Sequence, residues 1–188
     1  YTEFNSIPGD YIEIGVLRGG CIIAMILKLI QLGKKRKIHL YDTFSGMTAP
    51  TEHDVDYQGN PGIDVCGLPN LLCSLEKVKS NIDSVLKIYG YPSELIEYHA
   101  GDICKTPIEK IPKQIALLRL DTDFYESTKF ELDYFEPNLS ENNGKHGMVI
   151  IDDYGHWNGC RKAVDEFLLK NNRIIRKIDY TGIYFTKL

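Results

Sequence analysis

Long apolar runs and an excess of positive charge are both lacking in this chain of 188 residues. The most apolar stretch, residues 21–32, is too short to span a bilayer and is interrupted by Lys28. We therefore expect no membrane partner. The formal net charge of −4 leaves no electrostatic footprint for nucleic acid, so we expect no nucleic-acid partner.

Paired cysteine motifs are lacking as well. The five cysteines are odd in number and scattered, and no C-x-x-C pair or zinc-ligand spacing occurs among them. We expect reduced thiols and hence a cytoplasmic protein, since no signal peptide is visible. The chain opens at Tyr1 without an initiator methionine, so we expect further residues in front of it.

The common phosphate-binding motifs are also missing. The glycines at 15, 19 and 20 do not match G-x-G-x-x-G, and a Walker A motif is excluded because Lys and Ser/Thr do not follow Gly20. A strand, a glycine turn and a helix start are nevertheless expected over residues 9–20, an arrangement that lets a ligand approach the backbone closely. Glu13 would repel a pyrophosphate and suit a positively charged ligand. A tight turn with a surface glutamate is the alternative.

What the chain does have is a regular alternation of strands and helices, which predicts a single α/β domain over residues 1–188 with a doubly wound parallel sheet. Strands are expected at 11–16, 37–42, 95–100, 115–121 and 148–152, and a terminal hairpin at 173–180 and 183–188. Helices are expected at 19–32, 74–89, 125–139 and 160–171. The long loop 43–73 is rich in Gly, Pro and Asp, and its acidic part from residue 47 reads as a solvated lid.

Acidic residues end two of the buried runs. Asp121 follows I-A-L-L-R-L, and Asp152 and Asp153 follow M-V-I-I. The carboxyl ends of parallel strands share one crevice, where unpaired charges are costly and repel one another. A hard divalent cation with oxygen ligands would relieve this repulsion, with Asp123 as a fourth acid nearby. Capping of the helices that follow is the alternative.

Two further acids follow the second and third strands. Asp42 stands where an acidic residue hydrogen-bonds ribose hydroxyls in nucleoside-binding sheets. Gly101 and Asp102 stand where an adenine edge would be contacted. Each could be a plain turn residue, but their recurrence on consecutive strands favours a nucleoside site.

Five segments, in this order along the chain, resemble the macrocin O-methyltransferase family of metal-dependent sugar O-methyltransferases. They are P-G-D-Y-I-E-I-G-V-L-R-G-G (8–20), Y-D-T-F-S-G (41–46), S-L-E-K-V-K-S-N (74–81), A-L-L-R-L-D-T-D-F-Y-E-S-T (116–128) and V-I-I-D-D-Y-G-H-W-N-G-C-R-K-A-V-D-E-F (149–167). The resemblance implies a Rossmann-like class I methyltransferase with a seven-stranded, mostly parallel sheet, a C-terminal antiparallel hairpin and helices on both faces.

The resemblance also implies roles for individual residues. S-adenosyl-L-methionine would be bound by residues of the first three strand ends: Glu13, Gly15, Arg18, Gly19, Gly20, Asp42, Thr43, Ser45, Gly101 and Asp102. Mg²⁺ would be held by Asp121, Asp152 and Asp153, and Asp123 would be the general base. Asp123 could instead cap the following helix. His156 is an alternate base or a plain loop histidine.

The expected reaction is methyl transfer to a hydroxyl of a sugar or glycosylated small molecule. A catechol-type acceptor, a metal-dependent phosphohydrolase and a non-catalytic nucleoside-binding protein are the alternatives. Family members carry an N-terminal helical segment that covers the site and supports oligomers. Little precedes Ile7 here, so we expect that segment to be absent, disordered or trimmed, and a homo-oligomer stays possible.

Overall fold

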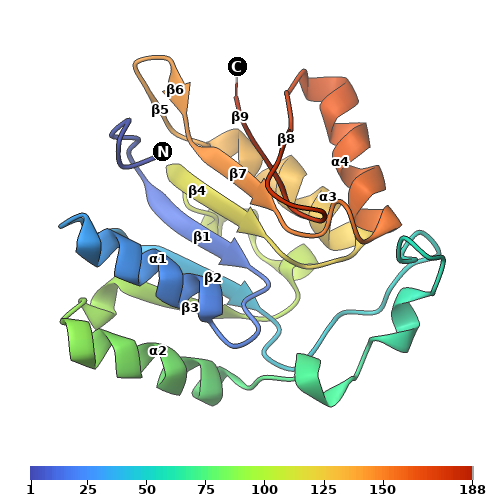
Figure 1. The fold of residues 1–188 in the computed structure, drawn as a ribbon, viewed down its shortest axis with the longest axis horizontal. Coiled ribbons are helices and arrows are strands. Elements are labelled where there is room, and N and C mark those ends of the chain that lie inside the picture. The colour runs from blue at the N-terminus through green and yellow to red at the C-terminus, as the bar shows by residue number, and fades with distance from the viewer. Residues whose placement is uncertain (188) are drawn as a thin grey trace.

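A seven-stranded sheet runs through the centre of the protein (Figure 1), whose computed structural model describes residues 1–187. The strands lie in the order β3-β2-β1-β4-β7-β9-β8. Their bounds are β1 Asp10–Ile14, β2 Ile38–Asp42, β3 Ile96–Ala100, β4 Ile115–Leu120, β7 Met148–Ile151, β8 Arg176–Lys177 and β9 Ile183–Thr186. The expected seven-stranded sheet is thereby confirmed.

The first five strands of that order are mutually parallel, and β9 is antiparallel to both of its neighbours. The predicted C-terminal hairpin is therefore confirmed, although Leu188 lies outside the described residues. Its first strand is shorter than 173–180. The Asp179 carboxylate accepts hydrogen bonds from the backbone N–H groups of Thr181 and Gly182, which closes a turn and takes the chain out of the sheet.

Helices cover both faces of the sheet (Figure 1). Helices α1 (Gly20–Gln31) and α2 (Leu75–Tyr89) pack on one face, and α3 (Tyr125–Tyr134) and α4 (Asn158–Asn171) on the other. The helix predicted to reach residue 139 ends at Tyr134, and a 3₁₀ turn over Glu136–Asn138 follows it. Pro137 lacks the backbone N–H that a continuing α-helix would need.

Several short elements complete the chain. A two-stranded hairpin of β5 (Glu141–Asn142) and β6 (Lys145–His146) was not predicted. Single 3₁₀ turns occupy Gly62–Asp64, Pro69–Leu71, Ser93–Leu95, Ile103–Lys105 and Ile108–Lys110, and the first two lie within the long loop 43–73. Over residues 1–187, no helix combines the length and the apolar character that crossing a bilayer requires.

The position of the site follows from the strand order. The chain builds outward from β1 through β2 to β3, then returns to place β4 on the other side of β1. Such a reversal opens a crevice at the carboxyl ends of the two central strands, since their connections leave in opposite directions. Residues that follow β1, β2, β4 and β7 are thereby brought to one edge of the sheet.

Candidate active site

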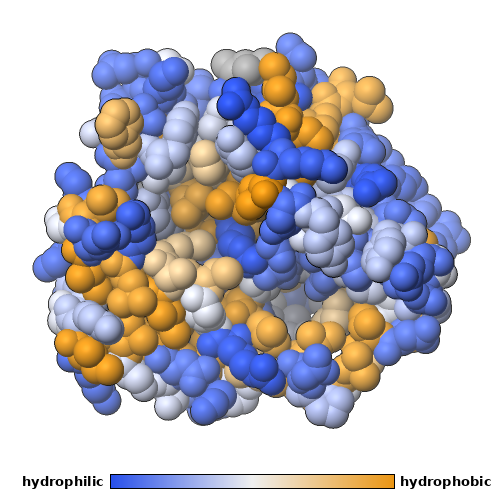
Figure 2. All heavy atoms as spheres, viewed as in Figure 1, coloured by the Kyte–Doolittle hydropathy of each residue, from blue (hydrophilic) through white to orange (hydrophobic). Residues whose placement is uncertain are grey.

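A cavity of about 340 Å³ lies at the carboxyl ends of the parallel strands. Figure 2 shows the surface hollowed there, with apolar and hydrophilic residues around the opening. Most of its polar lining comes from residues that end strands, together with the start of α3: Gly15, Asp42, Thr43, Gly101, Asp121, Thr122, Asp123, Ser127, Asp152 and Asp153. The volume is in the lower part of the range for small-molecule sites.

Three aspartates converge at one side of this cavity. The backbone N–H of Asp121 donates to the Ile14 carbonyl at 2.9 Å, and that of Asp152 to the Leu120 carbonyl at 3.0 Å. Backbone pairing across β1, β4 and β7 therefore sets the positions of these residues. One carboxylate oxygen from each of Asp121, Asp152 and Asp153 lies within 4.8 Å of the others.

Arg119 reaches the same group from within β4, and the sequence reading missed it. Its guanidinium contacts Glu13 at 2.8 Å, Asp121 at 2.6 Å and Asp152 at 2.9 Å. The sequence did contain a sign of this contact, because Arg119 is the one charged residue in the run I-A-L-L-R-L. A buried charge in such a strand needs a partner, so this arginine pointed to acids at the same edge.

The acids outnumber the positive charge that Arg119 supplies. Burial raises the pKa of Asp121 to about 7 and that of Glu13 to about 8, although the guanidinium opposes the shift in both. Burial and the neighbouring aspartates raise the pKa of Asp153 well above its ordinary value. Oxygen donors with excess negative charge are the ligands that Mg²⁺ prefers, so the residues present fit such an ion.

Asp123 lines the cavity beside this group in a left-handed backbone conformation, with φ of 67°. Its Oδ1 accepts a hydrogen bond from the indole N–H of Trp157 at 2.7 Å, and its own N–H donates to Asp153 at 3.2 Å. Burial raises the pKa of Asp123, while the bond from Trp157 opposes the shift. A carboxylate held in this way is a stronger base than a solvated one.

The capping alternative for Asp123 is wrong, because another aspartate does that work. The Tyr125 N–H, in the first turn of α3, donates to Asp54 Oδ1 at 2.7 Å. Asp54 Oδ2 accepts from the N–H and the hydroxyl of Thr51. Asp54 is buried, so the expectation that the acids of the loop are all solvated is wrong at this residue.

The side of the cavity formed by the ends of β1, β2 and β3 contains Gly15, Asp42, Thr43 and Gly101. Gly15 has φ of 83°, and a Cβ there would overlap the Asp121 carbonyl, so only glycine allows β1 and β4 to close at this point. The Asp42 carboxylate already accepts from the N–H groups of Val16, Leu17 and Phe44. Asp42 therefore also holds the turn after β1.

The other predicted cofactor residues are not among those that line the cavity, within the described part of the chain. Glu13 is buried against Arg119, and Gly19 sits at the N-terminus of α1. Arg18 donates to the Asn70 carbonyl at 3.3 Å. Gly20 and Ser45 are exposed.

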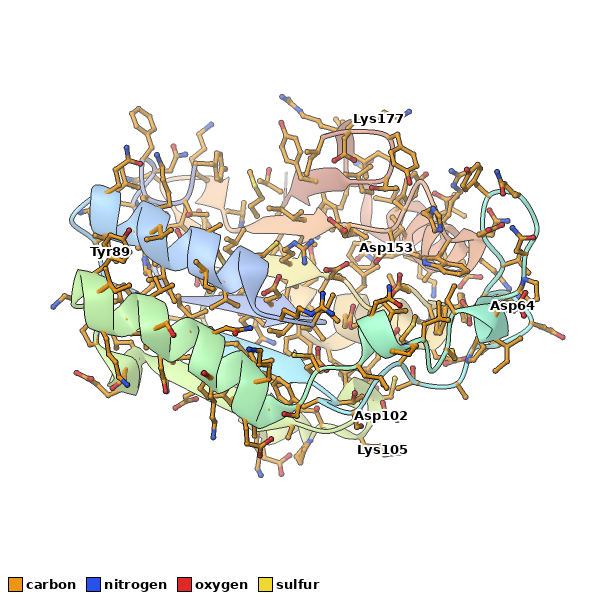
Figure 3. The ribbon with its side chains drawn as sticks, turned by 60° about the horizontal axis from the view of Figure 1, so that its bottom comes forward. Asp64, Tyr89, Asp102, Lys105, Asp153 and Lys177 are labelled. Carbon is orange, nitrogen blue, oxygen red and sulfur yellow. The ribbon has the colours of Figure 1, made fainter. Side chains whose placement is uncertain are left out.

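Asp102 and His156 also lie outside the lining. Asp102 accepts from the Cys104 N–H at 3.0 Å and pairs with Lys105 at 3.1 Å. Figure 3 shows this pair at the periphery, while Asp153 lies toward the middle of the molecule. The His156 ring packs on the rings of Tyr57 and Trp157.

A doubly wound seven-stranded sheet with an antiparallel hairpin and acids at its switch point defines a class I methyltransferase. Residues 2–187 match the macrocin O-methyltransferase (TylF) family. The chain belongs to this family and is an S-adenosylmethionine-dependent O-methyltransferase. The resemblance seen in the sequence is confirmed, and membership of this family excludes the phosphohydrolase and the non-catalytic alternatives.

Characterised relatives and a solved structure agree with this assignment. The chain is 32% identical to the 8-demethyl-8-(2,3-dimethoxy-alpha-L-rhamnosyl)-tetracenomycin-C 4'-O-methyltransferase of Streptomyces olivaceus, over 96% of its own length and 67% of that protein. It is 31% identical to the demethyldecarbamoylnovobiocin O-methyltransferase of Streptomyces niveus, over 97% and 68%. The structure of the O-methyltransferase NovP superposes with a TM-score of 0.82 at 30% identity, covering 99% of this chain and 74% of NovP.

Proposed function

We propose that this protein transfers the methyl group of S-adenosylmethionine to a hydroxyl of a sugar or glycosylated small molecule, in a Mg²⁺-dependent reaction. The observation that carries the proposal is the convergence of Asp121, Asp152 and Asp153 beside Asp123 in one cavity. The related enzymes named above support a glycosylated acceptor.

The proposed base is Asp123. Methyl transfer from a sulfonium to an alcohol is an in-line displacement, in which the acceptor oxygen must lose its proton as the new bond forms. Asp123 Oδ2 would take that proton, while Trp157 holds Oδ1 and keeps the carboxylate in one orientation. Asp121, Asp152 and Asp153 would hold the Mg²⁺, which orients the acceptor hydroxyl and lowers its pKa when bound.

The cofactor would lie over the ends of β1 and β2. Gly15 allows the backbone to approach the methionine part, and the Asp42 carboxylate and Thr43 face the same cavity. Gly101, after β3, borders the region where the adenine would lie. Among the remaining predicted contacts, Glu13 and residues 18–20 would act through the turn and α1 rather than from the lining.

We also infer that residues 1–188 form one methyltransferase domain in a reducing cytoplasmic compartment. A single sheet built from strands between Asp10 and Thr186 supports the first point, and five unpaired cysteines support the second. Self-association is proposed as well, and apolar side chains left exposed at Phe4 and Leu169 are consistent with it. Sedimentation velocity measures the oligomeric state.

The proposal is tested by separating the metal from the base. Turnover is measured with methyl-labelled S-adenosylmethionine and a panel of free and glycosylated sugars, and binding of S-adenosylhomocysteine by calorimetry. EDTA and Asp121→Asn should each abolish turnover and leave S-adenosylhomocysteine binding largely intact. Asp123→Asn should still bind Mg²⁺ and lose about 10²–10⁴-fold in rate, the range for loss of a general base.

Asp133→Asn, an exposed aspartate on α3, is the matched control and should keep full activity. Turnover that survives both EDTA and Asp121→Asn would remove the metal from the mechanism. Full activity in Asp123→Asn would leave His156 as the next candidate for the base.

A further inference from the structure

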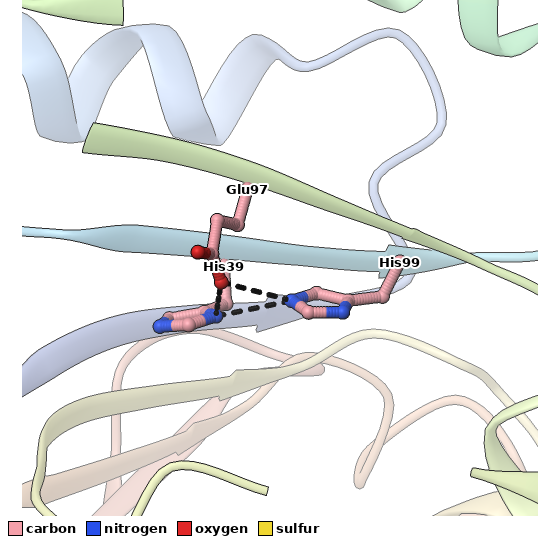
Figure 4. A group of neighbouring side chains, drawn as sticks. All are labelled: His39, Glu97 and His99. Atoms are coloured by element: carbon pink, nitrogen blue, oxygen red, sulfur yellow. Dashed lines mark hydrogen bonds and ion pairs between the residues drawn. The ribbon is translucent and has the colours of Figure 1, made fainter. Parts of the chain in front are cut away.

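Three nitrogen and oxygen donors meet at the edge of the sheet, away from the cavity acids. His39 lies on β2, and Glu97 and His99 lie on the edge strand β3 (Figure 4). The parallel register pairs His39 with Glu97, so alternate residues place all three side chains on one face. His39 Nδ1 lies 3.0 Å from His99 Nε2 and 3.2 Å from Glu97 Oε2, and these last two atoms are 3.8 Å apart.

These separations match the edges of a tetrahedral coordination sphere. Zinc bonds of about 2.0–2.1 Å in tetrahedral geometry place neighbouring ligand atoms roughly 3.3–3.4 Å apart. The three distances at this cluster fall on both sides of that value. Two imidazoles and one carboxylate also form a ligand set known for zinc sites that keep an open position.

The groups behind these donors orient them for ligation. His39 Nε2 lies 2.9 Å from Asp10 Oδ2, so a proton held at Nε2 leaves the Nδ1 lone pair directed at the cluster. Lys37 Nζ lies 2.6 Å from Glu97 Oε1, which fixes this carboxylate and leaves Oε2 for the site. Asp10 and Glu97 together still carry more negative charge than Lys37 offsets.

The cluster is accessible and is distinct from the cavity acids. His39 is buried, whereas the side chains of His99 and Glu97 are 28% and 41% exposed, so an ion and a water can enter from solvent. Strand β1 separates β2 from β4, and His39 lies near the start of its strand rather than at the carboxyl end. The Tyr41 ring stacks on His99 and lines the cofactor cavity, so the two sites are neighbours.

We propose that His39, Glu97 and His99 bind a zinc ion, with a water as the fourth ligand, and that this ion clamps β3 to β2. Without the ion, one imidazole donates to the other, and the cluster is a hydrogen-bonded network. Binding of a borderline transition metal, and its dependence on these three side chains, distinguishes the two states.

The experiment measures Zn²⁺ binding by equilibrium dialysis and by the shift in Tm, in protein that carries Asp121→Asn and Asp152→Asn so that the cavity acids do not contribute. One equivalent of Zn²⁺ should bind and raise the Tm. Glu97→Gln and His99→Ala should each weaken binding by at least about 100-fold, and Asp10→Asn by roughly 10–100-fold through His39. Co²⁺ should give the intense visible absorption of a four-coordinate site in the parent protein and not in Glu97→Gln or His99→Ala.

His146→Ala, on β6, is the matched control and should bind Zn²⁺ as the parent does. Circular dichroism checks that each variant is folded, and Glu97→Gln, which changes an accessible side chain, remains informative if His99→Ala is not. Absence of Zn²⁺ binding, or equal binding in Glu97→Gln and the parent, would overturn the proposal and leave a histidine network without a metal.

Discussion

Arg119 brings one positive charge into a group of three carboxylates, those of Glu13, Asp121 and Asp152. Arg119→Met should lower the free energy of unfolding of the EDTA-treated protein by about 3–5 kcal/mol, because the buried acids lose their partner. Urea denaturation measures the change. Addition of Mg²⁺ should restore part of it, since the ion supplies charge to the same acids.

Two further variants complete this test of the stability that Arg119 contributes. Arg119→Lys keeps the charge, but a single ammonium cannot reproduce the fork that spans Asp121 and Asp152, so its loss should be intermediate. Arg161→Met, on the exposed face of α4, is the control and should cost little. Equal losses in the Arg119 and Arg161 variants would contradict the role assigned to Arg119.

Glu131 is fully buried in α3 and accepts a hydrogen bond from the Thr122 hydroxyl at 2.9 Å. Burial raises its pKa from 4.5 in the unfolded chain to about 8. As the pH rises through this window, the unfolded chain releases its proton first, so the folded state loses stability. The EDTA-treated protein should lose roughly 3–4 kcal/mol between about pH 5 and about pH 8 through this group.

Glu131→Gln removes the titration and keeps the shape of the side chain, so its stability should fall less over that pH range. Urea denaturation at several pH values provides the measurement. Glu126→Gln, an exposed glutamate in the first turn of the same helix, should keep the slope of the parent protein. A slope unchanged in Glu131→Gln would mean that the group is ionised throughout.

At the scale of elements, Asp54 joins the long loop to α3. It accepts from the Tyr125 N–H in the first helical turn and from Thr51 within the loop. Gly159, in the first turn of α4, lies so close to Asp54 that a Cβ at this position would overlap the Asp54 carboxylate. The loop 43–73 is therefore anchored to two helices.

Asp54→Ala should lower the free energy of unfolding by about 1–3 kcal/mol, since buried donors lose their acceptor. It should also speed chymotrypsin cleavage in the loop, where Tyr57 is 58% exposed. Asp64→Ala, an exposed residue of the same loop, is the control. Unchanged cleavage in Asp54→Ala would show that the loop is held by other contacts.

The bounds of elements with a strong hydrophobic periodicity were predicted within a few residues. The bounds of elements whose residues also form competing turns were not. Helix α2 begins after Ser74 as predicted, because the Ser74 hydroxyl accepts from the Lys77 N–H, a local signal. Helix α3 ends at Tyr134, before Pro137, and the strand expected over 173–180 is limited to Arg176–Lys177. In both regions a turn that uses nearby residues competes with the regular element.

At the scale of the whole molecule, the strand order brings distant segments to one edge. Sequence position alone showed that Asp121, Asp152 and Asp153 end buried strands, and parallel strands share a carboxyl edge, so their meeting could be predicted. The family segments, which span most of the chain, carried the assignment as an O-methyltransferase. Most of the predicted cofactor residues around the turn after β1, by contrast, are not among the residues that line the cavity.

The sequence by itself determined the alternation of strands and helices, the closing hairpin and the acids of the cavity, because these depend on periodicity and on local order along the chain. Only the tertiary structure decided which side chain meets which. Arg119 beside Glu13, Asp54 as the cap of α3, and His39 beside Glu97 and His99 each join segments that are remote in sequence. Such contacts are set by register and strand order, which long-range packing selects and no local pattern encodes.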